Sequence, residues 1–240
     1  MGPSKANLRL VMFDIDGTLT ESMKLDEECF IRAFKDVFGF ADIDTDWMRY
    51  KHVTDSGLLQ EIFHMRAGRA ISPHETLKFQ QRFFTLLGNA SAASPFRAVK
   101  GAVELLRCLS TSQAHQVSLA TGGWRVSARL KMESAGMRFD DFPAASADDA
   151  VAREDIMRAS MQRASTAQGG HKFASTIYVG DGVWDARVCR GLGFPFIGIG
   201  TGVHAEKLRA EGAVRVFANL SDGNSLLTAL DMIAVETQRL

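Results

Sequence analysis

VMFDIDGTLT, residues 11–20, places two carboxylates two residues apart at the end of an apolar run, and a glycine follows at once. Leu10–Phe13 predicts a short buried strand, because an unbroken apolar run that ends in a turn signal is typical of a parallel strand covered on both faces. Asp14 and Asp16 then fall at the carboxyl end of a strand, where open α/β sheets bind ligands. Two aspartates there repel each other unless a cation or proton compensates, and Mg²⁺ is expected because it prefers hard oxygen ligands. A polar turn is the alternative interpretation of this pair.

Composition narrows the class of protein. The chain has 240 residues, which predicts one or two domains, and 46% hydrophobic residues, which is typical of a soluble globular protein. Lys plus Arg and Asp plus Glu both number 28, so no net field is expected to attract nucleic acid or an anionic membrane. No apolar run approaches the ~18 residues of a membrane span, and Met1–Leu8 lacks the apolar core of a secretory signal.

The cysteines and histidines give no metal-ligand pattern. Cys29, Cys108 and Cys189 lie far apart, each in a stretch with a helical pattern, and they predict buried free thiols in a reducing compartment. We therefore expect a cytoplasmic protein. The six histidines are scattered without the spacing of a zinc site, so they are expected at the surface or in packing.

From residue 95 onward, strand and helix patterns alternate with short loops. This alternation predicts a doubly wound, mostly parallel α/β sheet with helices on both faces. The expected strands after the first are Gln116–Ala120, Thr176–Val179 and Phe194–Ile199. The expected helices are Gly101–Leu109, Trp124–Ser134, Arg153–Ala167 and Val183–Arg190.

Residues 22–94 have a helical pattern without convincing strands. The expected helices are Asp26–Phe38, Ser56–Met65 and Pro73–Leu87, the last started by Ser72 and ended by Gly88. A helical block directly after the first strand predicts a cap domain of residues 22–94, inserted into an α/β core of residues 1–21 and 95–240. The hinges are expected near residues 20–23 and 92–97.

Three further features lie at predicted strand ends or helix starts. Thr121 precedes two glycines, and such a turn can hold phosphate oxygens or simply cap a helix. Arg153 begins a helix, where the dipole disfavours a cation, so a separate partner such as a carboxylate or phosphate is expected. An exposed or ion-paired arginine is the alternative. Asp181 and Asp185 form a second acidic pair at a strand end, although Asp181 could instead be a helix cap.

In this order the four features resemble the motifs of the haloacid-dehalogenase-like hydrolase superfamily over nearly the whole chain. The motifs are D-x-D-G-T at Asp14–Thr18, a strand-terminal Thr121, a basic residue at Arg153 and G-D-x-x-x-D at Gly180–Asp185. The helical insert is similar to the family's small α-helical cap, and the likeness is strongest to the phosphoglycolate phosphatase and β-phosphoglucomutase branch. Arg153 departs from the family's usual Lys, and Gly182-Val183-Trp184 departs from a small polar residue after the first Asp.

The resemblance implies a two-step phosphate-ester hydrolysis. Asp14 would attack phosphorus, and Asp16 would be the general acid and then the general base. Mg²⁺ would be held by the Asp14 carboxylate, the Asp16 backbone carbonyl and Asp181, and Asp185 would orient these ligands from behind. A second set of residues would hold the transferring phosphate oxygens: Thr121, the Gly122 N–H and Arg153.

Asp16 separates the branches of the family. By resemblance the dehalogenases carry Tyr and the phosphonoacetaldehyde hydrolases Ala at this position, whereas an acid suits a leaving alkoxide that needs a proton. We therefore predict a Mg²⁺-dependent phosphatase of small phosphorylated metabolites. A sugar phosphomutase and a non-catalytic binding protein on the same fold remain as alternatives, and neither the substrate nor the oligomeric state follows from the sequence. The polar run from Trp47 to Asp55 is expected to be a helix cap and solvated surface.

Overall fold

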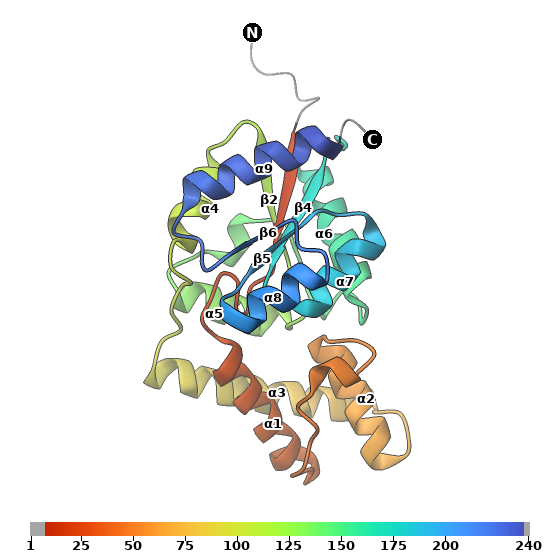
Figure 1. Cartoon of the computed structure of the whole chain (residues 1–240). Helices are drawn as coiled ribbons and strands as arrows, with labels where there is room; N and C mark the ends of the chain where they lie inside the picture. Colours follow the sequence, from red (N-terminus) through yellow and green to blue (C-terminus); the bar gives the residue numbers. More distant parts are fainter. Residues whose placement is uncertain (1–7, 238–240) are drawn as a thin grey trace.

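The computed structural model describes residues 8–237, and its centre is a parallel sheet (Figure 1). Within these residues the sheet has six strands in the order β3-β2-β1-β4-β5-β6, with every neighbouring pair parallel. The strands are β1 Arg9–Phe13, β2 His115–Ala120, β3 Ala144–Ala145, β4 Thr176–Gly180, β5 Phe196–Ile199 and β6 Arg215–Phe217. The order reverses between β1 and β4, which confirms the predicted doubly wound sheet.

Helices cover both faces of the sheet and extend beyond one edge. They are α1 Met23–Phe38, α2 Asp55–Ala67, α3 Pro73–Ala93, α4 Ala102–Ser110, α5 Arg125–Ser134, α6 Arg153–Ala167, α7 Val183–Leu192, α8 Gly202–Ala210 and α9 Gly223–Thr237. Two short 3₁₀ turns, Trp47–Arg49 and Phe139–Asp141, complete the described elements. None of the helices in residues 8–237 is long and apolar enough to cross a membrane.

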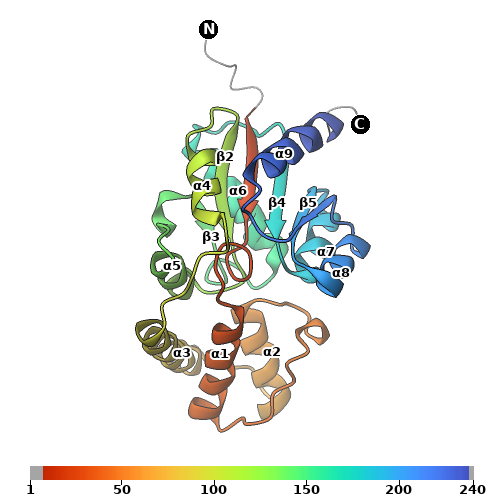
Figure 2. The ribbon, with the colours of Figure 1, turned by 60° about the vertical axis from the view of Figure 1, so that its left-hand side comes forward.

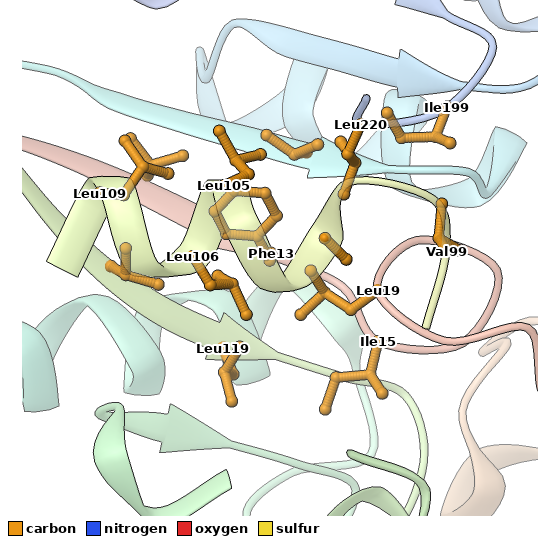
Figure 3. Packing of buried hydrophobic residues seen from close by; sticks show 14 of the residues in the cluster. Phe13, Ile15, Leu19, Val99, Leu105, Leu106, Leu109, Leu119, Ile199 and Leu220 are labelled. Carbon is orange, nitrogen blue, oxygen red and sulfur yellow. The ribbon is translucent and has the colours of Figure 1, made fainter. Parts of the chain in front are cut away.

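Alternation along β1 shows how the two faces are filled. Val11 and Phe13 face a cluster with α4, α5 and α9, whereas Leu10 and Met12 face a second cluster with α6, α7 and α8. Figure 3 shows Phe13 beside α4, close to Leu105 of that helix. Because successive side chains of a strand point to opposite faces, an unbroken apolar run is buried on both sides, as the sequence predicts.

The helices α1, α2 and α3 lie beyond the carboxyl ends of the strands and share an aromatic cluster (Figures 1 and 2). The ring of Phe30 contacts those of Phe79 and Phe83, with centroid distances of 5.2 and 5.7 Å. Trp124, from the turn after β2, inserts into this cluster, and its indole N–H donates to the Ser56 hydroxyl at 2.9 Å. The helical segment therefore rests directly on the end of β2.

Two local predictions are wrong. Gly88 does not end a helix at Leu87: α3 continues to Ala93 and stops before Pro95, because a proline disfavours the helical conformation in the residue before it. Cys29 and Cys189 are buried as predicted, but Cys108 is exposed. The division into a cap of residues 22–94 and a core of residues 1–21 and 95–240 stays a prediction, and its residues 1–7 and 238–240 lie outside the described part of the chain.

Candidate active site

The loop after β1 brings the first and the fourth predicted motifs together. The Asp14 N–H donates to the Val179 carbonyl at 2.9 Å, so β1 and β4 stay paired up to the catalytic candidate. Gly17 has φ +76°, and a Cβ there would lie 2.2 Å from Asp181 Oδ2. Only glycine meets both conditions. The Thr18 hydroxyl then donates to Asp181 Oδ1 at 3.2 Å, which fixes the first motif against the fourth.

Three buried acids form a cluster at the point where the strand order reverses. Asp14, Asp181 and Asp185 each offer an oxygen within 4.8 Å of the others. Burial raises the pKa of Asp14 to about 8, with Arg153 opposing the rise and Asp185 adding to it. Burial, and then the charge of Asp14, also raise the pKa of Asp181 well above its usual range. A hard divalent cation would relieve this repulsion, so the donor set fits the predicted metal.

Arg153 is the cation beside this acid cluster. Its guanidinium lies 2.8 Å from Asp185 Oδ1 and 3.4 Å from Asp14 Oδ1, and it is also 3.3 Å from the Tyr178 hydroxyl. Burial by itself lowers the pKa of Arg153, but the charges of Asp185 and Asp14 and its contact with Tyr178 raise it above its usual range. The Arg153 Nε atom is buried and has no hydrogen-bond partner among the described residues. Arg153 is therefore buried rather than exposed, and it is ion-paired with Asp185 and Asp14.

The turn Thr121–Gly123 lies against this guanidinium. The Thr121 hydroxyl is buried and accepts from the Gly123 N–H at 3.0 Å. A Cβ on Gly122 would lie 2.3 Å from Arg153 Nη2, so the backbone and the guanidinium are in direct contact. The Gly122 carbonyl accepts from the Asp55 N–H at 2.7 Å, which joins this turn to the start of α2.

Neither helix-cap alternative holds for the predicted site residues. The N-cap residue of α5 is Trp124, three residues after Thr121. The N-cap residue of α7 is Gly182, whose N–H donates to Asp185 at 3.3 Å, while the Asp181 carboxylate contacts Thr18 as described. The structure thus brings all the predicted site residues to one edge of the sheet: Asp14, Asp16, Thr121, Gly122, Arg153, Asp181 and Asp185.

Asp16 stands apart from the acid cluster. Its carboxylate accepts from the Ser22 hydroxyl at 2.5 Å and pairs with the Lys131 ammonium, 2.7 Å from Oδ1 and 2.9 Å from Oδ2. The same ammonium lies 2.5 Å from Asp26 Oδ1. Burial alone lowers the pKa of Lys131, but Asp16, Asp26 and Asp55 more than offset it and raise the pKa above its usual range.

Lys131 was not predicted as a site residue, although its position in the helical pattern of α5 indicated burial. The buried side of α5 consists of Ser127, Ala128, Lys131 and Met132. Residues at this spacing lie in a stripe on one side of a helix, so Lys131 is on the side of α5 that faces the protein core. A lysine on such a stripe needs a carboxylate partner, because an unpaired buried ammonium is costly.

A cavity of about 100 Å³ lies between this edge of the sheet and the helical segment. Its core side holds Asp14, Asp16, the Thr121–Gly123 turn, Arg153 and Trp184. Its other side holds Met23, Asp26, Glu27, Phe30, Trp47, Val53, Thr54, Asp55 and Leu58. The polar run 47–55 is thus only partly solvated: Thr54 caps α2 as predicted, but it also lines this cavity with Trp47 and Asp55.

Comparisons with known proteins agree with this geometry. The family model described as haloacid dehalogenase-like hydrolase matches residues 8–193. Among solved structures, a hydrolase from Pseudomonas syringae has a TM-score of 0.72 and 21% identity, covering 93% of this chain and 98% of its own. A candidate β-phosphoglucomutase from Bacteroides vulgatus has a TM-score of 0.71 and 19% identity, with coverages of 95% and 90%.

A predicted phosphoglycolate phosphatase from Haemophilus somnus 129Pt has a TM-score of 0.63 and 16% identity, with coverages of 94% and 100%. Identities this low show a shared fold alone. A search of the curated proteins finds no match.

Proposed function

This chain belongs to the haloacid dehalogenase-like hydrolase family, and from that membership we propose that it is a Mg²⁺-dependent phosphatase of small phosphorylated metabolites. The observation that carries the proposal is the buried set around Asp14. Its carboxylate lies 3.4 Å from the Arg153 guanidinium and within 4.8 Å of the nearest oxygens of Asp181 and Asp185. Phosphoryl transfer needs an acid placed between a cation that binds the phosphate and further acids that hold or orient a metal ion.

The metal would be held by the carboxylates of Asp14 and Asp181 and by the Asp16 backbone carbonyl, with Asp185 orienting this set. Asp185 accepts from Gly182 and pairs with Arg153, so its position is fixed from two sides. When bound, Mg²⁺ supplies positive charge that offsets the repulsion between a carboxylate and a phosphate ester.

In the first step an Asp14 carboxylate oxygen attacks phosphorus, and an aspartyl-phosphate forms as the ester P–O bond breaks. Thr121, the Gly122 N–H and Arg153 hold the other phosphate oxygens. The guanidinium already touches both Asp14 and the glycine turn, so it lies between the nucleophile and the phosphate-binding backbone. Asp16 gives a proton to the leaving alkoxide.

In the second step Asp16 takes a proton from water, the water oxygen attacks phosphorus, and the bond to Asp14 breaks to release phosphate. The helical segment α1–α3 acts as the cap that closes over the ester and excludes bulk water. A cavity of about 100 Å³ favours a small leaving group.

A phosphate-release screen over a panel of sugar, glycolate, polyol and nucleotide monophosphates tests the proposal. Wild-type protein with Mg²⁺ should release phosphate from at least one ester, EDTA should stop the release, and Asp14→Asn should be inactive. No release from any ester, with folded protein confirmed, would favour a non-catalytic binding protein. Conversion of a hexose 1-phosphate to the 6-phosphate would instead show a phosphomutase.

A further inference from the structure

The first turn of α1 is joined to Asp16 by two separate contacts. Ser22 is the N-cap residue of α1, yet its side chain makes no cap hydrogen bond. An N-cap serine usually accepts from a backbone N–H of the first turn. Here the Ser22 hydroxyl donates to Asp16 Oδ1 instead and also contacts the Thr20 hydroxyl at 2.7 Å.

The second contact runs through Lys131 of α5. Its side chain is 0% exposed, and its ammonium lies between Asp16 of the β1 loop and Asp26 of α1. One cation is therefore shared by two carboxylates from different parts of the fold. The nearby Asp55 of α2 also acts on the same ammonium.

The buried side of α5 does not need a lysine to fill the space that Lys131 occupies. A buried ion pair contributes little to stability compared with an apolar side chain of similar size, whereas removal of one partner leaves an uncompensated charge. Methionine would fit the same stripe, as Met132 does in the next position. The distinctive effect of an ammonium at this position is therefore on the groups that it binds.

We propose that Lys131 is a positioning residue: its ammonium holds the Asp16 carboxylate toward the phosphate-binding turn and, through Asp26, also ties α1 to the core. Asp16 Oδ2 lies 3.5 Å from the point where a Cβ on Gly123 would stand, so the carboxylate faces that turn. The contact of Asp26 with this ammonium and that of Ser22 with Asp16 join the first turn of α1 to the same carboxylate. The inference rests on the proposed phosphatase function for its kinetic half.

The kinetic arm compares an aliphatic phosphate ester from the screen with p-nitrophenyl phosphate. Lys131→Met should lower kcat for the aliphatic ester by about 10- to 100-fold and for the aryl ester by no more than about threefold, since nitrophenolate leaves without a proton. In an Asp16→Ala background, Lys131→Met should change kcat for the aliphatic ester by less than about twofold, because both changes act through one group. Equal losses on both esters, or a full loss in the Asp16→Ala background, would show a merely structural lysine.

The second arm does not depend on activity. Amide hydrogen exchange in residues 23–30 should become faster by about tenfold in Lys131→Met and in Asp26→Asn, because each removes a tie between α1 and the core. Lys24→Met is the matched control, since Lys24 is on the same helix and its side chain is 92% exposed. Unchanged exchange rates in both test variants would show that the Lys131–Asp26 pair does not hold α1 on the core.

Lys131→Met leaves three carboxylates without their cation, so its fold is checked by thermal unfolding. If it does not fold, Lys131→Met/Asp26→Asn replaces it, because the second change removes one of the facing charges. If wild-type protein hydrolyses neither ester, the proposed function and the positioning role fail together. The exchange arm still decides whether Lys131 ties α1 to the core.

Discussion

The Arg153 guanidinium lies 2.8 Å from Asp185 Oδ1 and 3.4 Å from Asp14 Oδ1, so one buried cation is shared by the candidate nucleophile and the acid behind it. Burial makes each of these charges costly by itself, and the pairing offsets the cost. The same guanidinium touches the Gly122 backbone, where the phosphate is proposed to bind. The relation predicts that changes at Arg153 alter both stability and turnover.

Arg153→Lys should keep turnover within about tenfold of wild type, because an ammonium retains the charge but not the planar fork. Arg153→Ala should lower kcat by about 10² to 10³-fold. It should also lower the free energy of unfolding by about 3–5 kcal/mol, because Asp185 and Asp14 lose a buried partner. Steady-state kinetics and urea unfolding measure the two effects. Equal losses for both variants would show that the planar guanidinium, and not its charge alone, is essential.

Asp14→Asn should abolish turnover and leave the fold intact. The amide has nearly the shape of the carboxylate but is not a nucleophile, so a loss on the order of 10⁴-fold or more is expected. Circular dichroism checks that the fold is intact, and phosphate release with Mg²⁺ measures the loss of turnover. Substantial Mg²⁺-dependent release by the folded variant would show that another group attacks phosphorus.

Gly122→Ala and Gly123→Ala form a matched pair on one turn. A Cβ on Gly122 would meet Arg153 Nη2 at 2.3 Å, whereas the atoms nearest to a Cβ on Gly123 lie at 3.5 Å. Gly122→Ala should therefore displace the guanidinium and lower kcat strongly, and Gly123→Ala should keep most of the activity. Similar kinetics for the two variants would contradict the close contact between Gly122 and Arg153.

Stability without metal should fall as the pH rises. Burial raises the pKa of Asp14 to about 8 and that of Asp26 to about 6, so the folded state holds protons that the unfolded chain releases near pH 4. The free energy of unfolding in EDTA should decrease between about pH 4 and pH 8, since the folded state binds more protons there. Mg²⁺ should oppose the decrease, because it binds the ionised acids of the folded state.

Urea unfolding at pH 5 and pH 8, in EDTA and in MgCl₂, measures this effect. Asp14→Asn is the control: it lacks the Asp14 proton, so its free energy of unfolding in EDTA should depend less on pH than that of wild type. Groups that titrate equally in both proteins, such as His115, cancel in the comparison. Identical pH dependence for the two proteins would show that Asp14 titrates normally in the folded state.

Much of this fold followed from local pattern. Leu10–Phe13 predicts β1 because an unbroken apolar run suits a strand buried on both faces, and the structure confirms it. The two-residue β3 and the three-residue β6 were not predicted, because such short pieces carry no periodicity of their own. Their existence depends on the neighbouring strands to which they pair.

The residues of the candidate site likewise include some that the sequence predicts and some that it does not. Asp14, Asp181 and Arg153 belong to short motifs at strand ends or helix starts, so the topology brings them together. Lys131 and Asp26 belong to no recognisable sequence motif, and their ion pair depends on how α5 and α1 pack against each other. Only the position of Lys131 on a buried helical stripe indicated a partner, and nothing local identified that partner as Asp16.

Asp16→Ala should separate the two chemical steps. Asp14 could still attack, but no group would protonate a poor leaving group or deprotonate the incoming water. General acid–base catalysis contributes about 10² to 10⁴ in rate, so turnover of an aliphatic ester should fall by that factor. An aryl phosphate needs little protonation, so it should still phosphorylate Asp14, and the aspartyl-phosphate should then persist. Its removal requires water activation, which the variant lacks.

Rapid acid quench and intact mass spectrometry should show one added phosphoryl group on Asp16→Ala, mapped to Asp14 by peptide analysis. The Asp14→Asn/Asp16→Ala double variant is the control and should show none. Loss of the Asp16 carboxylate also frees Lys131 to bind Asp26 alone, so the fold of both variants is compared by thermal unfolding. If turnover of the aliphatic and the aryl ester falls equally and no phosphorylated protein forms, the role of Asp16 is only to hold its neighbours in place. The proton transfers would then belong to another group in the cavity.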